Sequence, residues 1–346
     1  MASLETPDAL RSEMRTAWYR FLDLAAPLRP ALYAYCRRLT RNLWDAEDLV
    51  QDTLLRAFGH LGLINHDIRD PRAYLLRTAT NLWIDELRRR ETAARVHLTN
   101  PDNSSVMAVS PAVSGDLRNA GSRLLQRLSP QERAAVVLKE VFDMSLDEIS
   151  DLLATTKAAV KAALHRGRGR LREPEDATAS WRPLPSPELL DAFIDRYNAR
   201  DLKGLTKLLL DGGSVENVGE ALQFGRETFE RTHDNILFHV VHGHDEWPAA
   251  IRPDSVRVER VEFEGEPILL WLVTRQGSEA LEVVFRFEEQ DGRIARLRTY
   301  GFCPETMRAV GEGLGVDVRT GLYRAPTPGG APGGRWPELD LGDSTT

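Results

Sequence analysis

The spacing of apolar residues predicts helices through the first half of the chain. In residues 45–58, apolar or small side chains recur every three or four positions, as on one face of a helix. They are Leu49, Val50, Thr53, Leu54 and Phe58. Residues 70–90 repeat the pattern, and Pro71 lies in the first turn, where a helix tolerates proline. Their core positions are Leu75, Leu76, Ala79 and Leu82. Each segment is therefore expected to bury one face and to expose the other.

Residues 145–172 show the pattern of two short helices joined by a tight turn. Ser145 and Glu148 have the spacing of a capping box, and Thr156 can cap the second helix. A further helix, capped by Ser129, is expected immediately upstream, at 129–142. The apolar positions of the pair are Ile149, Leu152, Leu153, Val160 and Leu164. Two such helices form a helix-turn-helix, a unit that often binds DNA.

The pattern changes after residue 186. One amphipathic helix is expected first, with Leu189, Leu190, Phe193, Ile194 and Tyr197 on its apolar face, followed by a shorter helix that ends at Asp211-Gly212-Gly213. Four segments then alternate between apolar and polar residues, as strands with one buried face do. They are 255–263, 268–274, 280–288 and 294–301. Helices followed by an antiparallel meander predict an α+β domain shaped like a cone.

Proline-rich and glycine-rich stretches divide these blocks. We expect six segments: an all-α domain at 15–96, a linker at 97–115, a second all-α domain at 116–173, a proline-containing linker at 174–185, the α+β domain at 186–322 and a disordered tail at 323–346. The predicted fold class is therefore multi-domain. A length of 346 residues also favours two or three domains.

Charge is divided unevenly along the chain. The net charge of −7 by itself argues against nucleic-acid binding. Residues 1–185, however, hold 27 Lys and Arg against 24 Asp and Glu, a net of +3, while residues 186–346 hold 18 against 28, a net of −10. Residues 157–172 hold six Lys and Arg and no acid. This distribution favours DNA binding by the second helix of the pair, although a solvated charged face remains the alternative.

The two cysteines and the lack of long apolar runs exclude several classes of protein. Cys36 and Cys303 are too few for a disulfide framework or a four-thiolate zinc site, and we expect both to be buried. No apolar run reaches the ~20 residues of a membrane span, and residues 1–15 lack the apolar stretch of a signal peptide. These features predict a cytoplasmic protein.

The run LSPQERAAVVLKEVFDMSLDEIS, followed by TTKAAVKAALHRGRGRLR, resembles region 4 of the extracytoplasmic-function (ECF) group of bacterial sigma-70-type factors. The resemblance implies binding to the −35 promoter element and to the flap of the polymerase β subunit. The implied DNA contacts are Thr156, Lys157, Lys161, His165, Arg166 and Arg168. Four alanines at 158, 159, 162 and 163 leave few side chains to reach base edges, so phosphate contacts are expected to carry more of the affinity.

The run DAEDLVQDTLLRAF is similar to region 2.2 of the same family, and DPRAYLLRTATNLWIDELRRR resembles regions 2.3–2.4. The first similarity implies contact with the β′ clamp helices of core RNA polymerase through Asp48, Leu49, Gln51, Asp52, Leu55 and Arg56. The second implies binding and opening of the −10 element through Asn81, Trp83, Asp85, Arg88, Arg89 and Arg90. Stacking surfaces and cations suit DNA opening. A basic helix end that complements the helix dipole is the alternative explanation of the arginine triplet.

The third block resembles the SnoaL-like (NTF2-like) domain at the C-terminus of certain ECF factors, where it regulates the factor. The residues implied in regulation are Trp181, Pro183, Pro185, Asp211, Gly212 and Gly213. His239, His242, His244 and Asp245 have a spacing that could suggest a metal site, but histidines in loops or at strand edges are commoner. We expect no metal, and a pocket that serves packing or senses an unidentified small molecule.

These resemblances predict a sigma factor that binds core RNA polymerase, recognises the −35 and −10 elements of a promoter and melts the −10 element to start transcription. Its own C-terminal domain is expected to modulate it. The mechanism is binding, so neither catalytic residues nor a cofactor are expected. Two alternatives are a DNA-tethered NTF2-like isomerase or cyclase and an ordinary helix-turn-helix regulator.

Overall fold

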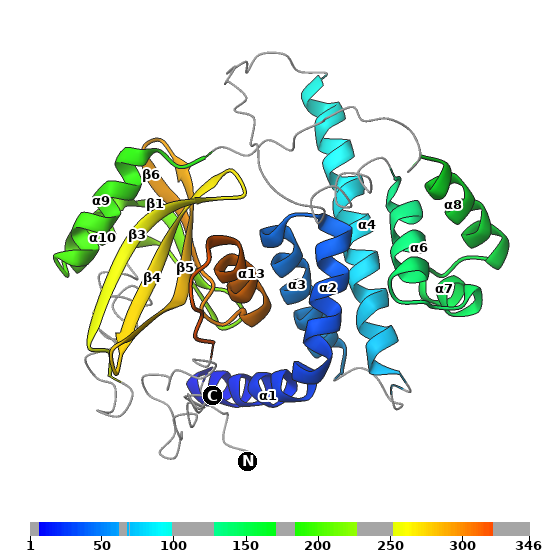
Figure 1. Ribbon diagram of the computed structural model, residues 1–346, viewed down its shortest axis with the longest axis horizontal. Coiled ribbons are helices and arrows are strands. Elements are labelled where there is room, and N and C mark those ends of the chain that lie inside the picture. The colour runs from blue at the N-terminus through cyan, green and yellow to red at the C-terminus, as the bar shows by residue number, and fades with distance from the viewer. Residues whose placement is uncertain are drawn as a thin grey trace. The chain divides into compact units, whose positions relative to one another are not determined.

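The computed structural model describes residues 7–61, 68, 70–98, 128–170, 184–226 and 252–320. The chain divides into two compact units, residues 1–178 and residues 179–346 (Figure 1). The first unit is helical, and the second combines helices with a sheet, which confirms the predicted fold class. None of the helices within these ranges is both long and apolar enough to cross a membrane.

Five helical elements open the first unit: α1 (Pro7–Ala25), the 3-10 turn η1 (Ala26–Leu28), α2 (Arg29–Thr40), α3 (Leu43–Leu61) and α4 (Pro71–Leu98). Asn42 caps α3 through the backbone N–H groups of Trp44 and Asp45, and Asp70 caps α4. The predicted apolar faces of α3 and α4 lie in the core. Local periodicity therefore identified the buried faces correctly.

Glu47 departs from the expectation that α3 buries its apolar face and exposes its polar one. Its side chain is fully buried and accepts hydrogen bonds from Arg29 at 2.6 Å and from Gln51 at 2.7 Å. Arg29, on α2, is itself 8% exposed. A buried carboxylate is stable only when a cation or donors satisfy it. The partner lies 18 residues away, beyond the reach of a local pattern.

Within the described residues, three more helices follow in this unit: α6 (Pro130–Glu140), α7 (Leu146–Leu152) and α8 (Lys157–Arg170). Ser129 and Glu132 form a full capping box on α6, and Ser145 and Glu148 form another on α7. The Thr156 hydroxyl accepts a hydrogen bond from the N–H of Ala159, which confirms it as the cap of α8. The helix-turn-helix is therefore α7 and α8, with α6 packed against both.

Gly167 lets α8 approach α6 closely. A Cβ added there would lie 2.9 Å from Cγ2 of Val136, closer than real side chains pack, whereas a Cβ on Gly169, one residue further on, would meet nothing within 4 Å. The two glycines of α8 thus differ in what surrounds them, although both lie within a helix.

We expect Gly167→Ala to lower the free energy of unfolding of the first unit by roughly 1–3 kcal/mol, because the β-branched Val136 cannot move aside without disturbing α6. Gly169→Ala is the control, and it should raise stability by about 0.5–1 kcal/mol through helix propensity. Thermal and urea unfolding of both variants measures the difference. Equal changes at the two positions would contradict close packing at Gly167.

The second unit begins with α9 (Pro187–Asn198) and α10 (Leu202–Leu208), capped by Ser186 and Asp201. Its strands are β1 (Leu209–Asn217), β2 (Ala221–Phe224), β3 (Ser255–Phe263), β4 (Glu266–Arg275), β5 (Ser278–Gln290) and β6 (Arg293–Thr299). They form one sheet in the order β2-β1-β6-β5-β4-β3. The last four match the predicted strands to within a few residues.

The four predicted strands form the expected antiparallel meander, but the sheet continues beyond it with two strands that were not expected. β1 pairs with β6 in parallel, so the sheet is mixed, and neither β1 nor β2 was predicted. Asp211-Gly212-Gly213 was taken to end a helix, but it lies within β1, where the register with β6 shifts between Leu209 and Ser214. Glycines in a strand commonly mark such a bulge.

The two faces of the sheet are covered differently. α9 and α10 pack on one face, where Phe193, Tyr197 and Phe285 form a cluster of rings. The helix α13 (Pro304–Leu314) lies on the opposite side (Figure 1). Its Gly313 lies directly against the ring of Phe263. Cys36 and Cys303 are both fully buried in their own units, as predicted.

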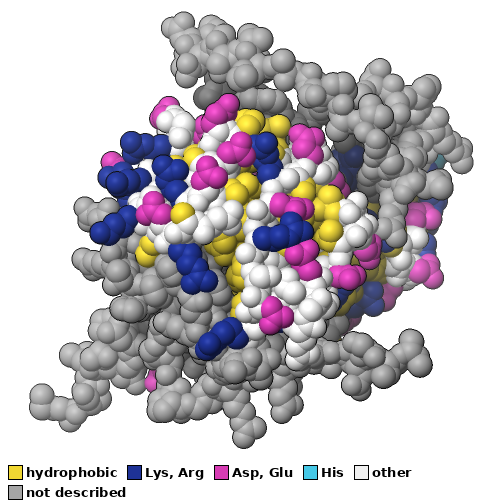
Figure 2. Space-filling model, turned by 60° about the vertical axis from the view of Figure 1, so that its left-hand side comes forward, with side chains coloured by type: hydrophobic (Ala, Val, Ile, Leu, Met, Phe, Trp, Pro, Cys, Tyr) yellow, Lys and Arg dark blue, Asp and Glu magenta, His cyan; other side chains and the backbone are white. Residues whose placement is uncertain are grey.

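Ion pairs satisfy many charged side chains of the second unit. Glu282 is fully buried and accepts two hydrogen bonds from Arg275, at 2.8 and 2.9 Å, and one from Arg319 at 2.5 Å. At the surface, Arg257 binds Glu279 in the same two-pronged way, with both distances 2.8 Å. Figure 2 shows one face of the molecule, on which Lys and Arg side chains lie among Asp and Glu side chains. The negative charge of this half is thus partly paired.

Candidate functional site

The first candidate surface is one side of α3. Asp48, Gln51, Asp52, Leu55 and Arg56 are spaced three or four residues apart and share this side. Leu55 is 55% exposed, which is unusual for a leucine in the middle of an amphipathic helix. Asp52 and Arg56 are exposed, while Asp48 and Gln51 are half-buried. The surface therefore combines an apolar centre with charged neighbours, a composition typical of protein–protein contacts.

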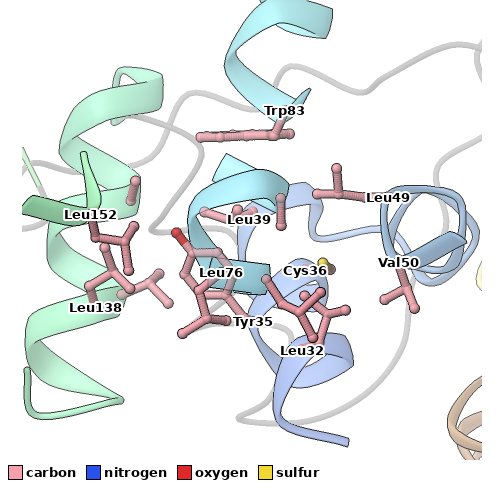
Figure 3. Packing of buried hydrophobic residues seen from close by; sticks show 14 of the residues in the cluster. Leu32, Tyr35, Cys36, Leu39, Leu49, Val50, Leu76, Trp83, Leu138 and Leu152 are labelled. Atoms are coloured by element: carbon pink, nitrogen blue, oxygen red, sulfur yellow. The ribbon is translucent and has the colours of Figure 1, made fainter. Parts of the chain in front are cut away.

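Leu49 does not belong to this surface. It is 8% exposed and belongs to the same buried cluster as Leu54 and Val50. Figure 3 shows Leu49 and Val50 in this cluster. Of the six residues that the resemblance implies on this helix, five therefore lie together on the surface, and Leu49 lies in the core beneath them.

The second candidate surface is a line of polar residues on α4. Asn81, Asp85 and Arg89 are each exposed and follow one another at intervals of four residues, so they lie on one side of the helix. Arg89 is 70% exposed at its side chain and lies 3.5 Å from Glu86. The side chains of Arg88 and Arg90 lie outside the described residues.

Trp83 points the other way. Its ring is 5% exposed, and the guanidinium of Arg133, on α6, lies over it at 5.1 Å from the ring centroid. In Figure 3 it lies on the same stretch of helix as the buried Leu76. In this arrangement the ring cannot stack on a nucleic-acid base.

The third candidate surface is the exposed side of α8, where Lys157, Lys161, His165 and Arg168 succeed one another at helical spacing. Acids of the same unit pair with part of this charge: Lys157 contacts Asp147, and Arg168 contacts Glu140. Both pairs are exposed, so they contribute little to stability and can be exchanged for phosphate. Among the cations of α8 whose side chains are described, Lys161 makes no ion pair with another described residue.

Arg166 has a structural partner. Its Nε donates to Glu132 at 2.9 Å, and Glu132 is 2% exposed and also caps α6 through the N–H of Ser129. Arg166 therefore joins α8 to the beginning of α6, and moving it to DNA would leave a nearly buried carboxylate without its cation.

In the second unit, Asp211 is 82% exposed at its side chain and lies 3.0 Å from Arg226. Gly212 is open to solvent, whereas a Cβ on Gly213 would lie 3.0 Å from two backbone carbonyl oxygens. An open pocket of about 430 Å³ adjoins these residues. It is lined by Leu210, Asp211, Gly212, Gly213, Gln290, Asp291, Arg293 and Ala295.

Several predicted residues cannot be placed. Trp181, Pro183 and the group His239, His242, His244 and Asp245 lie outside the described residues. Pro185, in the same linker, is described and buried. No cluster of three or more His, Cys, Asp or Glu within the described ranges has a geometry suited to a metal ion.

Comparison with known protein families assigns most of the first unit to two of them. The Sigma-70 region 2 family matches residues 24–92, and the Sigma-70 region 4 family matches residues 122–171. The first match contains α2, α3 and most of α4, and the second contains α6, α7 and α8. The three candidate surfaces of the first unit all lie within these two matches.

Comparison with individual proteins identifies the family of the chain. The ECF RNA polymerase sigma factor SigW of Bacillus subtilis (strain 168) is 32% identical over 165 residues, which cover 44% of this chain and 87% of SigW. SigG of Mycobacterium tuberculosis is 32% identical over 212 residues, or 53% of this chain, but the match spans only 57% of SigG. This chain therefore belongs to the family of ECF RNA polymerase sigma factors.

The second unit also has a counterpart. The probable ECF sigma factor SigI of Mycobacterium tuberculosis is 27% identical over 270 residues, which cover 75% of this chain and 86% of SigI. A match of that length cannot fit within residues 1–178, so it continues into the second unit.

One feature of the first unit was not predicted at all. Regions 2 and 4 pack on each other, and Arg133, Phe142, Tyr35 and Arg77 make the contacts between them. Arg133 lies in α6, whose start was predicted, and Phe142 lies just after its end, but nothing in the sequence pattern indicates a partner surface. The buried position of Trp83 is part of the same interface.

Proposed function

We propose that this protein binds core RNA polymerase and directs it to a promoter, where it recognises two elements and opens the DNA. The observation that carries the proposal is the joint presence of regions 2 and 4 in one chain, each with an exposed surface of the required chemistry. Binding to polymerase in the cytoplasm would need no catalytic group or cofactor of its own.

The polymerase contact in this proposal is the side of α3 centred on Leu55. Interfaces depend on a few anchors that lose water on binding, surrounded by polar groups that fix orientation. Leu55 is such an anchor, and Asp48, Gln51, Asp52 and Arg56 form its polar surroundings. The β′ clamp helices are the partner that the family resemblance implies for this surface, and the β flap is the implied partner of region 4.

The −10 contact is the line of Asn81, Asp85 and Arg89 on α4. Asn can pair with base edges, and arginines can hold the phosphates of the opened strand. The −35 contact is the exposed side of α8, whose short or apolar side chains between the cations limit reading of base edges. Affinity at this element is therefore expected to depend strongly on salt.

Lys161 offers a direct measurement of that dependence. We expect Lys161→Ala to reduce the slope of log affinity against log salt concentration by about 0.9, the value for one phosphate contact on duplex DNA. Fluorescence polarisation with a promoter fragment at several salt concentrations gives the slope. Lys203→Ala, an exposed lysine on α10, is the matched control and should leave the slope unchanged. An unaltered slope in Lys161→Ala would remove this lysine from the DNA contact.

We propose a regulatory role for the second unit, as an NTF2-like domain. Its helices-then-sheet order and the resemblance of Asp211-Gly212-Gly213 to a family motif support this. Gly212 supports a functional role for this motif, because neither a close contact nor a positive φ requires glycine at this position. The open pocket beside it is where we propose that a small molecule or another part of the transcription complex binds.

Run-off transcription with purified core polymerase tests the whole proposal. The full chain and a form truncated after residue 175 are compared on a pool of promoter fragments from the source genome. We expect promoter-dependent transcript from at least one form, and a change in its amount when the second unit is removed. If neither form gives promoter-dependent transcript, the sigma function is wrong. If both give equal amounts, the regulatory role of the second unit is wrong.

A further inference from the structure

The position of Trp83 conflicts with the −10 role that the family resemblance implies for it. The ring is nearly buried, and what lies over it is Arg133, a residue of region 4. Since the neighbouring Asn81 and Asp85 are exposed, the helix itself is accessible to DNA, and it is the opposite side of α4 that region 4 faces.

Arg133 connects three elements at once. Its Nη1 donates to the carbonyl of Leu39 at 2.8 Å, near the C-terminal end of α2, and its guanidinium lies over Trp83 on α4. Free carbonyls at a helix end attract cations. Burial lowers the pKa of Arg133 to about 10, so the side chain remains charged at neutral pH. One arginine of region 4 thus joins two helices of region 2.

Three further contacts cross the same boundary. The ring of Phe142, after α6, meets the ring of Tyr35 edge-on at a centroid distance of 5.6 Å, and the guanidinium of Arg72 lies 5.5 Å from the centroid of the Phe142 ring. Arg77, on α4, donates to the carbonyl of Asp151 at the end of α7. Around them, Leu138 and Leu152 of region 4 belong to the same buried cluster as Leu76 (Figure 3).

This packed arrangement cannot bridge two promoter elements. Their positions differ by about 25 base pairs, or roughly 85 Å of DNA at 3.4 Å per base pair. The helix α8 has 14 residues and is about 21 Å long at 1.5 Å per residue. With α6 in contact with both α8 and region 2, α8 cannot lie so far from α4. The connecting residues 99–127 are long enough for separation, since 29 residues can span up to about 95 Å.

We propose that Arg133, Trp83, Tyr35, Phe142 and Arg77 form a latch, which holds region 4 on region 2 in the free factor and keeps the Trp83 ring from DNA until the regions separate. The latch rests on the proposed sigma function, because it explains how a free factor is kept from engaging a promoter. Binding of region 2 and region 4 to separate sites on the polymerase would open it.

Energy transfer between two dyes, one on region 2 and one on region 4, measures directly whether the two regions are packed together. The dyes are attached to the full chain through His60→Cys on α3 and Thr155→Cys before α8, both exposed positions, while the native cysteines are buried. We expect high transfer in the free protein and a clear loss on adding core polymerase. Arg133→Ala should lower transfer without polymerase. Lys139→Ala, a cation of α6 that pairs with Asp143 within region 4, should leave it unchanged.

A second measurement separates opening from unfolding. In protein labelled with 5-fluorotryptophan, Trp83→Phe assigns the Trp83 fluorine signal, and Trp18 and Trp44 report on the core of region 2. Arg133→Ala should expose Trp83 to solvent and leave the other two signals in place. If all three signals change, region 2 has unfolded in this variant. Arg77→Ala, which changes an exposed side chain, then takes its place, and its energy transfer and Trp83 signal test the latch.

The latch is wrong if the free protein shows low transfer, or if the deciding variant leaves both the transfer and the Trp83 signal unchanged. It is also wrong if polymerase binds while transfer stays high. These outcomes are independent of transcription. If substitution of Arg133 opens the protein but no form of it gives a transcript, the latch is supported and the proposed sigma function is wrong.

Discussion

Replacing Glu282 with alanine is expected to destabilise the second unit by about 3–5 kcal/mol. The carboxylate is fully buried between Arg275, which is 5% exposed, and Arg319. Its removal leaves two guanidinium groups without their anion, one of them buried. Calorimetry of the full chain should show the loss in the unfolding transition of the second unit.

Glu279→Ala is the matched control for this prediction. Glu279 binds Arg257 with the same two-pronged geometry and similar distances, but the two side chains are 41% and 50% exposed. Water replaces the lost partner there, and Arg257 keeps its contact with Glu259, so little change is expected. Hydrogen bonding to Arg257 lowers the pKa of Glu279, so the pair is present at neutral pH and the comparison is fair. Comparable losses in the two variants would show that burial does not determine the cost.

Leu55→Asp is expected to weaken binding to core polymerase by at least about 30-fold, equivalent to roughly 2 kcal/mol. The side chain is more than half exposed on α3, so the substitution leaves the core intact. In the complex, an aspartate at this position would lose water without gaining a partner. Titration of labelled protein with core polymerase gives the dissociation constant.

Leu24→Asp controls for the general effect of placing a charge on an exposed leucine. Leu24 is 76% exposed at the end of α1 and lies outside the α3 surface. It should bind polymerase as the unaltered protein does, and thermal unfolding should show both variants folded. An unchanged dissociation constant for Leu55→Asp would mean that polymerase binds elsewhere.

Most helices of this protein could be predicted from the sequence because their signals are local. The capping boxes at Ser129 and Ser145 each involve two residues three positions apart, and the structure shows both. The apolar face of α9 follows from a spacing of three and four residues. Such patterns need no knowledge of the rest of the chain.

The burial of Trp83 could also have been predicted. It follows Leu76 by seven residues and Ala79 by four, so helical periodicity places it on the buried side of α4. The resemblance to regions 2.3–2.4 favoured exposure instead. The partner that covers it, Arg133, is 50 residues away, and a single sequence carries no signal for such a contact. The same limit applies to Glu47 and to strand β1.

The parallel pairing of β1 with β6 has a consequence for synthesis on the ribosome. β1 is made early, but its partner at 293–299 follows about eighty residues later. The sigma regions can therefore fold as soon as they emerge, since N-terminal domains generally fold first. The sheet of the second unit cannot be completed until residue 299 has left the ribosome. Every newly synthesised molecule thus passes through a period in which regions 2 and 4 exist without a folded second unit.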